Sequence, residues 1–306
     1  VEAPAVKDLK PSVIPPADPK FTTVPSTVNR SLGVPKTDRF PSLEFPFQHR
    51  ATLSNGTKVL LAERPGLPVV QISMQFEGAG FASDSNGKDG LASFTTGMMD
   101  EGSGQLDALA FADRAEALGA IISSGATLDT SNVSLSALSE NLDDSLALFT
   151  DVLLSPRFDQ TEIDRVRASW IAQIKQEKAR PAGIGGRVLR TQVYGSGHPY
   201  AVPARGLGEE SSIASLSRAD MQAWHQQFLR PDNATIMIVG DTTLKQMLPK
   251  LEAAFGGWKA PATGKPSAKV PAVALPSQNR LILIDQPGAV QANILIGQLV
   301  PSSMND

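Results

Sequence analysis

The sequence predicts an α+β fold, and three observations support that class. Regular patterning opens with a strand hairpin and a third strand, helical patterns fill the middle of the chain, and a short apolar run at residues 234–240 has the composition of a buried strand. Strands and helices that occur in separate runs are typical of α+β domains rather than of alternating strand-helix units.

The strands are expected from alternation and from turn chemistry. Asn55-Gly56 supplies the positive φ angles that a tight hairpin needs, so the flanking runs should pair. Gly78-Ala79-Gly80 ends the third strand with a sharp turn. The expected strands are 47–53, 58–63, 69–77, 120–128, 132–139 and 234–240.

The helices are expected where apolar residues recur every three or four positions. Asp107 is placed to cap one of them, and Ser217 with Asp220 three residues later forms the pattern of a capping box. The expected helices are 90–101, 107–118, 141–154, 161–178, 184–194, 217–228 and 244–255.

The composition is that of an ordinary globular protein. The 306 residues are 41% hydrophobic and 19% charged, which is enough for a sizeable core. A formal net charge of -3 without basic blocks argues against nucleic-acid or anionic-membrane partners. No long apolar run or secretory signal pattern is visible, so we expect no membrane span. The absence of cysteine excludes disulfides and thiolate chemistry.

Residues 1–45 form a proline-rich segment. Nine of the 23 prolines lie at or before position 46, so backbone donors are missing too often for regular structure. The segment is expected to be extended, either as a linker or as a strap on the globular body. A proline-rich ligand for an aromatic groove is the alternative.

The end of the sequence predicts a second unit. Residues 46–260 carry the α+β domain, and the proline-rich stretch 261–276 then has the composition of a linker. Residues 280–285 and 291–298 pattern as two strands, so 277–306 is expected to begin a second, apparently truncated domain. About 30 residues cannot bury a core of their own.

Several local motifs occur in a consistent order. They are Leu53-Ser54-Asn55-Gly56-Thr57-Lys58-Val59, Tyr194-Gly195-Ser196-Gly197-His198-Pro199, Arg230-Pro231-Asp232-Asn233 and Val239-Gly240-Asp241. In this order and spacing they resemble one domain of the pitrilysin and insulinase family of zinc peptidases, which includes the mitochondrial processing peptidases. The resemblance implies a two-layer domain with a mainly antiparallel sheet that helices cover on one side, and a second, similar domain after it.

The resemblance also locates a metal site that this chain has lost. Active family members carry H-x-x-E-H on the helix after the glycine-rich loop, where two histidines bind zinc and the glutamate activates water. Aligned on Gly90-Leu91-Ala92, those positions are Ser93, Thr96 and Gly97 here. The distal glutamate ligand aligns with Gln173, a neutral and weak ligand. The resemblance therefore implies no metal site and no catalytic residue in this chain.

No other cluster in the sequence replaces the lost one. His49, His198 and His225 are the three histidines, and none has a partner at helical spacing. We expect a structural or surface role for His198 and a solvent-facing position for His225. Ser93 has no identifiable base to make it a nucleophile. The glycines at 78–80 lack the residues of a nucleotide-binding loop.

The resemblance implies a non-catalytic half or subunit that closes a chamber and helps to bind peptide for an active, zinc-bearing partner. That partner half could belong to the same polypeptide or to another one. A core-protein-like scaffold without proteolysis is the alternative, and an active zinc protease with an unrecognised metal site is the weakest hypothesis. A periplasmic location is expected from the absence of cysteine and the family's frequent place in the bacterial envelope, with the cytoplasm left open.

Overall fold

The computed structural model describes residues 27–31, 33–34, 39–40, 42, 44–84, 87–265 and 270–300. Contacts divide the chain into two units, Val1–Phe45 and Pro46–Asp306. Most of the first unit lies outside the described residues, so the expected proline-rich strap stays a prediction. All helices and strands among the described residues belong to the second unit.

The second unit is built on one six-stranded sheet with the order β1-β2-β6-β3-β5-β4. Four of its pairings are antiparallel, and the one between β2 and β6 is parallel. The strands are β1 (Gln48–Thr52), β2 (Lys58–Glu63), β3 (Val69–Glu77), β4 (Ile121–Ala126), β5 (Thr130–Leu138) and β6 (Ala234–Gly240). The sequence prediction of a mainly antiparallel sheet is confirmed.

Strand β6 lies inside the sheet although it comes last in the chain. Thr235 aligns with Lys58 of β2 on one side and with Gln75 of β3 on the other. Its alternate residues Ile236 and Ile238 are almost fully buried, as the apolar run at 234–240 predicts. This strand therefore joins the amino-terminal hairpin to the rest of the sheet.

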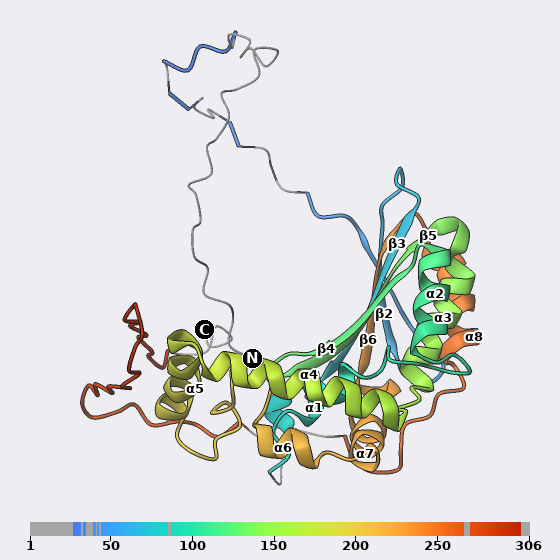
Figure 1. Ribbon diagram of the computed structural model, residues 1–306. Helices are drawn as coiled ribbons and strands as arrows, with labels where there is room; N and C mark the ends of the chain where they lie inside the picture. Colours follow the sequence, from blue (N-terminus) through green and yellow to red (C-terminus); the bar gives the residue numbers. More distant parts are fainter. Residues whose placement is uncertain are drawn as a thin grey trace, which may run out of the picture. The chain divides into compact units, whose positions relative to one another are not determined.

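The helices form the second layer. Figure 1 shows α2, α3 and α8 on one face of the sheet, with α1, α4, α6 and α7 grouped near one end of it. The α-helices are α1 (Leu91–Thr96), α2 (Ala108–Leu118), α3 (Leu142–Leu154), α4 (Gln160–Lys178), α5 (Pro181–Tyr194), α6 (Glu210–Ser215), α7 (Arg218–Phe228) and α8 (Leu244–Phe255). Short 3-10 turns cover Phe81–Ser83, Ser139–Asn141 and Pro231–Asn233. No helix in the described part of the chain is long and apolar enough to cross a membrane.

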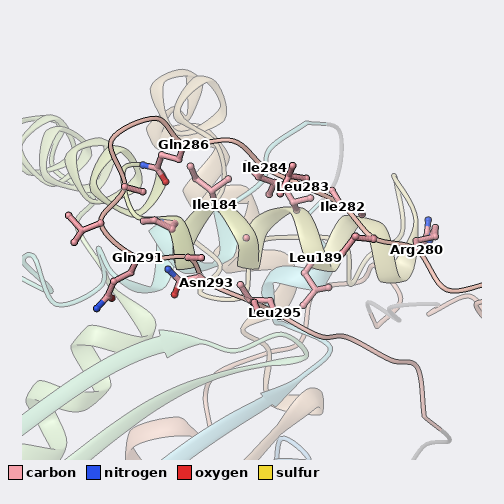
Figure 2. Close-up of a pocket in the computed structure, with 18 residues that line it drawn as sticks. Ile184, Leu189, Arg280, Ile282, Leu283, Ile284, Gln286, Gln291, Asn293 and Leu295 are labelled. Carbon is pink, nitrogen blue, oxygen red and sulfur yellow. The ribbon is translucent and has the colours of Figure 1, made fainter.

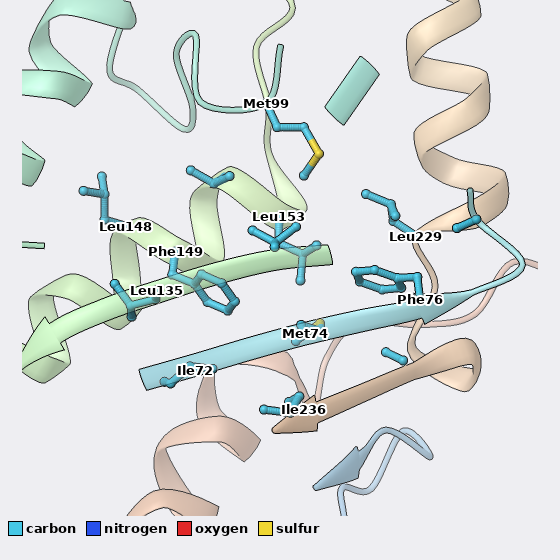
Figure 3. Close-up of a cluster of buried hydrophobic side chains, with 14 of the residues drawn as sticks. Ile72, Met74, Phe76, Met99, Leu135, Leu148, Phe149, Leu153, Leu229 and Ile236 are labelled. Atoms are coloured by element: carbon cyan, nitrogen blue, oxygen red, sulfur yellow. The ribbon is translucent and has the colours of Figure 1, made fainter. Parts of the chain in front are cut away.

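The core lies between the sheet and the helices. Burial alternates along β3 and β5, because successive side chains of a strand point to opposite faces. Figure 3 shows Ile72 and Met74 of β3 close to Phe149 and Leu153 of α3. Phe149 also meets Phe255 of α8 edge to face, with ring centroids 6.2 Å apart. This packing fixes the helix layer on one face of the sheet.

Helix starts follow the expected capping chemistry. The side chain of Asp107 accepts a hydrogen bond from the backbone N–H of Ala110, which satisfies a free donor at the start of α2. Ser217 and Asp220 form the predicted capping box of α7. A second box, Thr243 with Gln246, begins α8. Local sequence therefore sets these three boundaries.

Two expectations about helices were wrong. The helix expected at 90–101 ends at Thr96, because Gly97 closes it and Gly102 adopts a φ of 106° in the turns that follow. Helix α6 was not expected, since its six residues are too short to show a clear period.

The two strands expected at 280–285 and 291–298 are also absent from the described residues. A strand needs a neighbour for its backbone hydrogen bonds, and the described chain supplies none there. Instead, Ile282 is 45% exposed beside α5 while its neighbour Leu281 is 98% exposed. The exposure of neighbouring residues alternates here as it does in a strand, but no strand in the described residues pairs with this segment.

Candidate functional site

The segment that the sequence alignment matches to the family's metal-binding helix forms α1, here called the degenerate helix. All six residues of α1 are buried. Gly90 precedes it with a φ of 95°, a left-handed conformation that favours glycine. The carboxylate of Asp84 accepts hydrogen bonds from the backbone N–H groups of Gly90 at 2.8 Å and Ala92 at 3.0 Å. Burial raises the pKa of Asp84 to about 7. A partly buried carboxyl group thus caps this helix from outside it.

The aligned metal positions on α1 carry no metal-binding group. Thr96 donates its hydroxyl to the carbonyl oxygens of Ala92 at 2.9 Å and Ser93 at 3.1 Å, so it is used within the helix. The buried Oγ of Ser93 has no hydrogen-bond partner among the described residues. Neither hydroxyl offers the imidazole or carboxylate that zinc prefers, and Gly97 offers no side chain.

Trp170 of α4 occupies the space beside Gly97. A Cβ added at Gly97 would lie 3.2 Å from the carbonyl oxygen of Ser93 and 3.3 Å from the Trp170 ring. The ring also meets Phe94 edge to face at 5.4 Å, and its Nε1–H donates to the carbonyl of Leu207 at 3.0 Å. An aromatic ring therefore packs where a side chain on Gly97 would have to go.

Gln173 lies on the same helix, three residues after Trp170, and is exposed. The structure brings Trp170, and not Gln173, against α1. The alignment of Gln173 with the distal ligand stays a prediction. Sequence reasoning missed Trp170, although a bulky aromatic one helical turn from an aligned metal position was a usable signal.

A loop at residues 203–209 closes over the start of α1. A Cβ added at Gly206 would lie 2.5 Å from the Oγ of Ser93, and one added at Gly208 would overlap the carbonyl of Asp89. Arg187 holds this loop by donating to the carbonyl of Gly208 at 3.0 Å and to the carboxylate of Glu209 at 2.8 Å. Backbone therefore packs closely on backbone at Gly208.

The described residues do not fit a zinc ion elsewhere either. Within the described ranges, no three side chains of His, Cys, Asp or Glu are grouped so that they could hold a metal. His49 is 3.4 Å from Glu63 on the neighbouring strand. His198 stacks on Tyr194 at 5.2 Å and its Nε2 lies 3.0 Å from the carbonyl of Pro271. Both have structural contacts.

The expectation that His225 faces solvent was wrong. Its Nε2 lies 2.7 Å from the carbonyl of Leu153, and its ring meets Phe158 edge to face at 6.2 Å. Burial lowers the pKa of His225, which favours the neutral ring. The amphipathic pattern of α7 placed this residue on the polar side, but the carbonyl at the end of α3 gives it a buried partner.

Strand β4 lies at the edge of the sheet beside the degenerate helix. It pairs with β5 on one side only. Ser124 donates its hydroxyl to the carbonyl of Thr96 at 2.7 Å, which ties the strand to the end of α1. In the described residues, the outer edge of β4 has no ladder partner, so its backbone groups are free to pair with an added strand.

A separate cavity of about 510 Å³ lies along α5. Figure 2 shows the segment 280–295 looped around this helix, with Ile184, Leu189 and Leu295 among the side chains that line the cavity. Gln286 donates to the carbonyl of Ala179 at 2.9 Å, which fastens the segment to the end of α4. The lining is mostly aliphatic and holds no cluster of catalytic groups.

Two protein-family models match the chain. The one described as insulinase (peptidase family M16) matches residues 58–194, and the one described as peptidase M16 inactive domain matches residues 215–306. Together these matches include strands β2 to β6, helix α1 and the segment around α5.

Curated relatives are similar at low identity. The non-peptidase homologue YmxG of Helicobacter pylori is 24% identical over 197 residues, which is 64% of this chain and 45% of that protein. Subunit 1 of the mitochondrial cytochrome b-c1 complex of Caenorhabditis elegans is 23% identical over 62% of this chain and 39% of its own length. The zinc protease PqqE of H. pylori is 23% identical over 66% of this chain and 45% of its own length. The chain thus spans less than half of the length of each relative.

Solved structures share the fold. A peptidase M16 inactive domain from Pseudomonas fluorescens superposes with a TM-score of 0.68 at 28% identity, covering 75% of this chain and 54% of that one. The first half of the periplasmic protease PqqL from Escherichia coli superposes with a TM-score of 0.65 at 17% identity, covering 75% and 49%. The family matches show that the chain belongs to the M16 peptidase family, also called the pitrilysin or insulinase family, as one of its inactive members.

Proposed function

We propose that this chain is the non-catalytic half of a two-part M16 zinc peptidase, which closes the chamber and helps to bind peptide for an active partner half. The observation that carries the proposal is the state of α1. The helix keeps its place, its buried residues and its cap from Asp84, while Trp170 fills the space at Gly97. A scaffold preserved without its metal chemistry suits a role in assembly with a half that supplies zinc.

The free edge of β4 gives this half a way to hold peptide. An extended peptide can add to an exposed sheet edge through its main-chain hydrogen bonds. The strand lies beside α1, to which Ser124 connects it. A peptide that pairs with β4 would therefore run past the position that metal occupies in active relatives.

A reconstitution experiment tests the proposal. The purified chain alone should contain no stoichiometric zinc by metal analysis and should cleave no peptide. An H-x-x-E-H-bearing M16 protein encoded beside it should form a complex with it on size exclusion and hydrolyse peptides faster in the mixture. A mixture without complex and without any gain in activity would contradict the proposal, and one zinc per chain would contradict the inactive assignment.

A structural scaffold is the second candidate. Its support is the similarity to subunit 1 of the mitochondrial cytochrome b-c1 complex, at 23% identity. In that case a complex would form in the same experiment, but the partner's peptide hydrolysis would be unchanged. A periplasmic location is part of the leading proposal, and fractionation of cells that produce the full natural protein tests it.

A further inference from the structure

A second groove lies where three helices of the helix layer end together. It has a volume of about 710 Å³, which is within the range of small-molecule sites. Residues from the last turns of α3, α7 and α8, and from the segments that follow these helices, line it. Its described lining contains no residue of α1 or β4, so it is separate from the site described above. It is here called the helix-end groove.

The three helix ends make the groove rich in hydrogen-bond acceptors. The last carbonyl groups of an α-helix have no partner within the helix, and this end of the helix carries a partial negative charge. Helix α3 ends at Leu154, α7 at Phe228 and α8 at Phe255. Four lining residues have a backbone carbonyl that accepts no hydrogen bond from the described chain, namely Leu154, Gln226, Ala253 and Ala254. The groove therefore combines free acceptors with the negative ends of three helices.

The ring of His225 adds one more acceptor to the lining. Its Nε2 lies 2.7 Å from the carbonyl of Leu153, and because a carbonyl can only accept, Nε2 carries the hydrogen. Burial lowers the pKa of His225, so the ring is neutral and Nδ1 is an acceptor. No residue in the described ranges donates to Nδ1. A bound molecule with an N–H group can supply that donor.

Aromatic residues form part of the apolar lining. The ring of Trp258 is partly exposed and packs edge to face on Phe76, with centroids 6.1 Å apart. The face of a tryptophan ring attracts cations. Phe158 is buried and has a φ of 50°, which makes it the one non-glycine residue with a positive φ in the described chain. Strained backbone of this kind is found preferentially at binding sites, where the surrounding structure holds it.

The charge of the groove also favours a cation. Lys259 carries the single formal charge in the described lining, and no carboxylate accompanies it. A lysine near the carboxyl end of a helix is stabilised by the partial charge of that end. The ammonium group of Lys259 is therefore an internal competitor for any cation that enters the groove.

We propose that the helix-end groove binds an organic cation, in which an ammonium or guanidinium group is carried on an apolar stem. The N–H groups of the cation donate to the free carbonyls and to Nδ1 of His225, and the stem lies against Trp258. This site is independent of the peptide binding proposed above. A free amine and a lysine or arginine side chain of a polypeptide share this chemistry, and the experiments below distinguish the two sources.

The test compares phenethylamine, phenethyl alcohol and phenylpropionate, which share an aromatic stem but are cationic, neutral and anionic. Titration of the full chain is followed by NMR of the tryptophan indole N–H signals. At about 50 mM salt the amine should bind about tenfold more tightly than the alcohol, and it should shift the signal that Trp258→Phe removes. Equal binding of the amine and the alcohol, or tighter binding of the acid, would overturn the proposal.

Lysine variants then test the role of the helix ends. Lys259→Ala removes the internal competitor and should strengthen binding of the amine severalfold. Lys245→Ala is the matched control, because Lys245 is exposed at the start of α8, about 15 Å along the helix from its other end. It should leave the affinity unchanged. Unchanged or weaker binding by Lys259→Ala would contradict a cation site.

A capped tripeptide with one central lysine identifies the source of the cation. If it binds more tightly than phenethylamine, the groove receives a side chain of a polypeptide. If it binds more weakly, the ligand is a free amine. Failure of both probes to bind more tightly than phenethyl alcohol would overturn the proposal and leave the proposed function untouched.

Discussion

The two faces of the sheet differ in how they use the same strands. On the covered face, Ile72, Met74 and Leu135 are almost fully buried under helices, and every residue of α1 is buried as well. On the open face, many alternate residues of β3 and β5 are hydroxyls and amides that lie partly exposed, and exposed apolar residues such as Val239 and Ile121 stand beside them. The same strands thus supply a tightly packed core on one side and a partly exposed surface on the other.

The largest expected difference between the faces concerns core packing. Phe149→Ala should lower the free energy of unfolding by about 3–5 kcal/mol, because it removes a fully buried ring between the sheet and α8. Gln71→Ala, on the open face of β3, should change it by less than about 0.5 kcal/mol. Chemical denaturation of the two variants measures both values. Similar losses would mean that the open face is also a packed one.

The loop over α1 tests whether the filled site is rigid. Gly208 has a φ of 71°, and a Cβ there would overlap the carbonyl of Asp89, so Gly208→Ala should cost about 3 kcal/mol or more. Gly197→Ala is the control, since its φ is 81° but a Cβ would meet nothing within 4 Å. It should cost only about 1 kcal/mol of backbone strain. Equal decreases in melting temperature for the two variants would show that the loop can move to accommodate the added Cβ.

The cap of α1 should respond to pH. The pKa of Asp84 is raised from 3.8 to about 7 by burial, so the folded chain binds this proton more tightly than the unfolded chain. The contribution of this group to stability therefore grows as pH falls from about 7 towards about 4, and is lost as pH rises through 7. Relative to Asp84→Asn, the native chain should gain roughly 2 kcal/mol between pH 7 and pH 5. If the free energy of unfolding changed with pH by the same amount in both proteins, the raised pKa of Asp84 would be contradicted.

The smallest effect is expected at an exposed cap on the covered side. Asp107→Ala removes the hydrogen bond from Ala110 at the start of α2 and should cost about 1 kcal/mol. Asp107→Asn, which keeps an acceptor, should recover most of the loss. Urea denaturation at neutral pH measures both. A loss of several kcal/mol in Asp107→Ala would contradict this prediction. It would mean that α2 contributes more to the free energy of unfolding than an exposed helix start is expected to.

Local chemistry made much of the fold predictable from sequence. Asn55-Gly56 set the first hairpin, Ser217 with Asp220 set the start of α7, and alternation or, for β6, a short apolar run located the strands of the sheet. The identities of Ser93, Thr96 and Gly97 could likewise be read directly. These features depend on residues that are near one another in the chain.

The rest depended on contacts between distant residues. The ring of Trp170 against Gly97 and the bond from His225 to Leu153 arise from how helices meet, which no local period records. The strands expected at 280–298 show the converse, because a strand pattern needs a neighbour before it becomes a strand.

The interior position of β6 has a consequence for how the chain folds during synthesis. The hairpin of β1 and β2 is made early, but its only link to the remaining sheet is the parallel ladder to a strand that ends at Gly240. Parallel pairing between such distant segments closes slowly, because loop entropy must be lost before the contacts form. The inner edge of the hairpin therefore stays unpaired until the ribosome has released β6. Folding of this domain should therefore be late and cooperative.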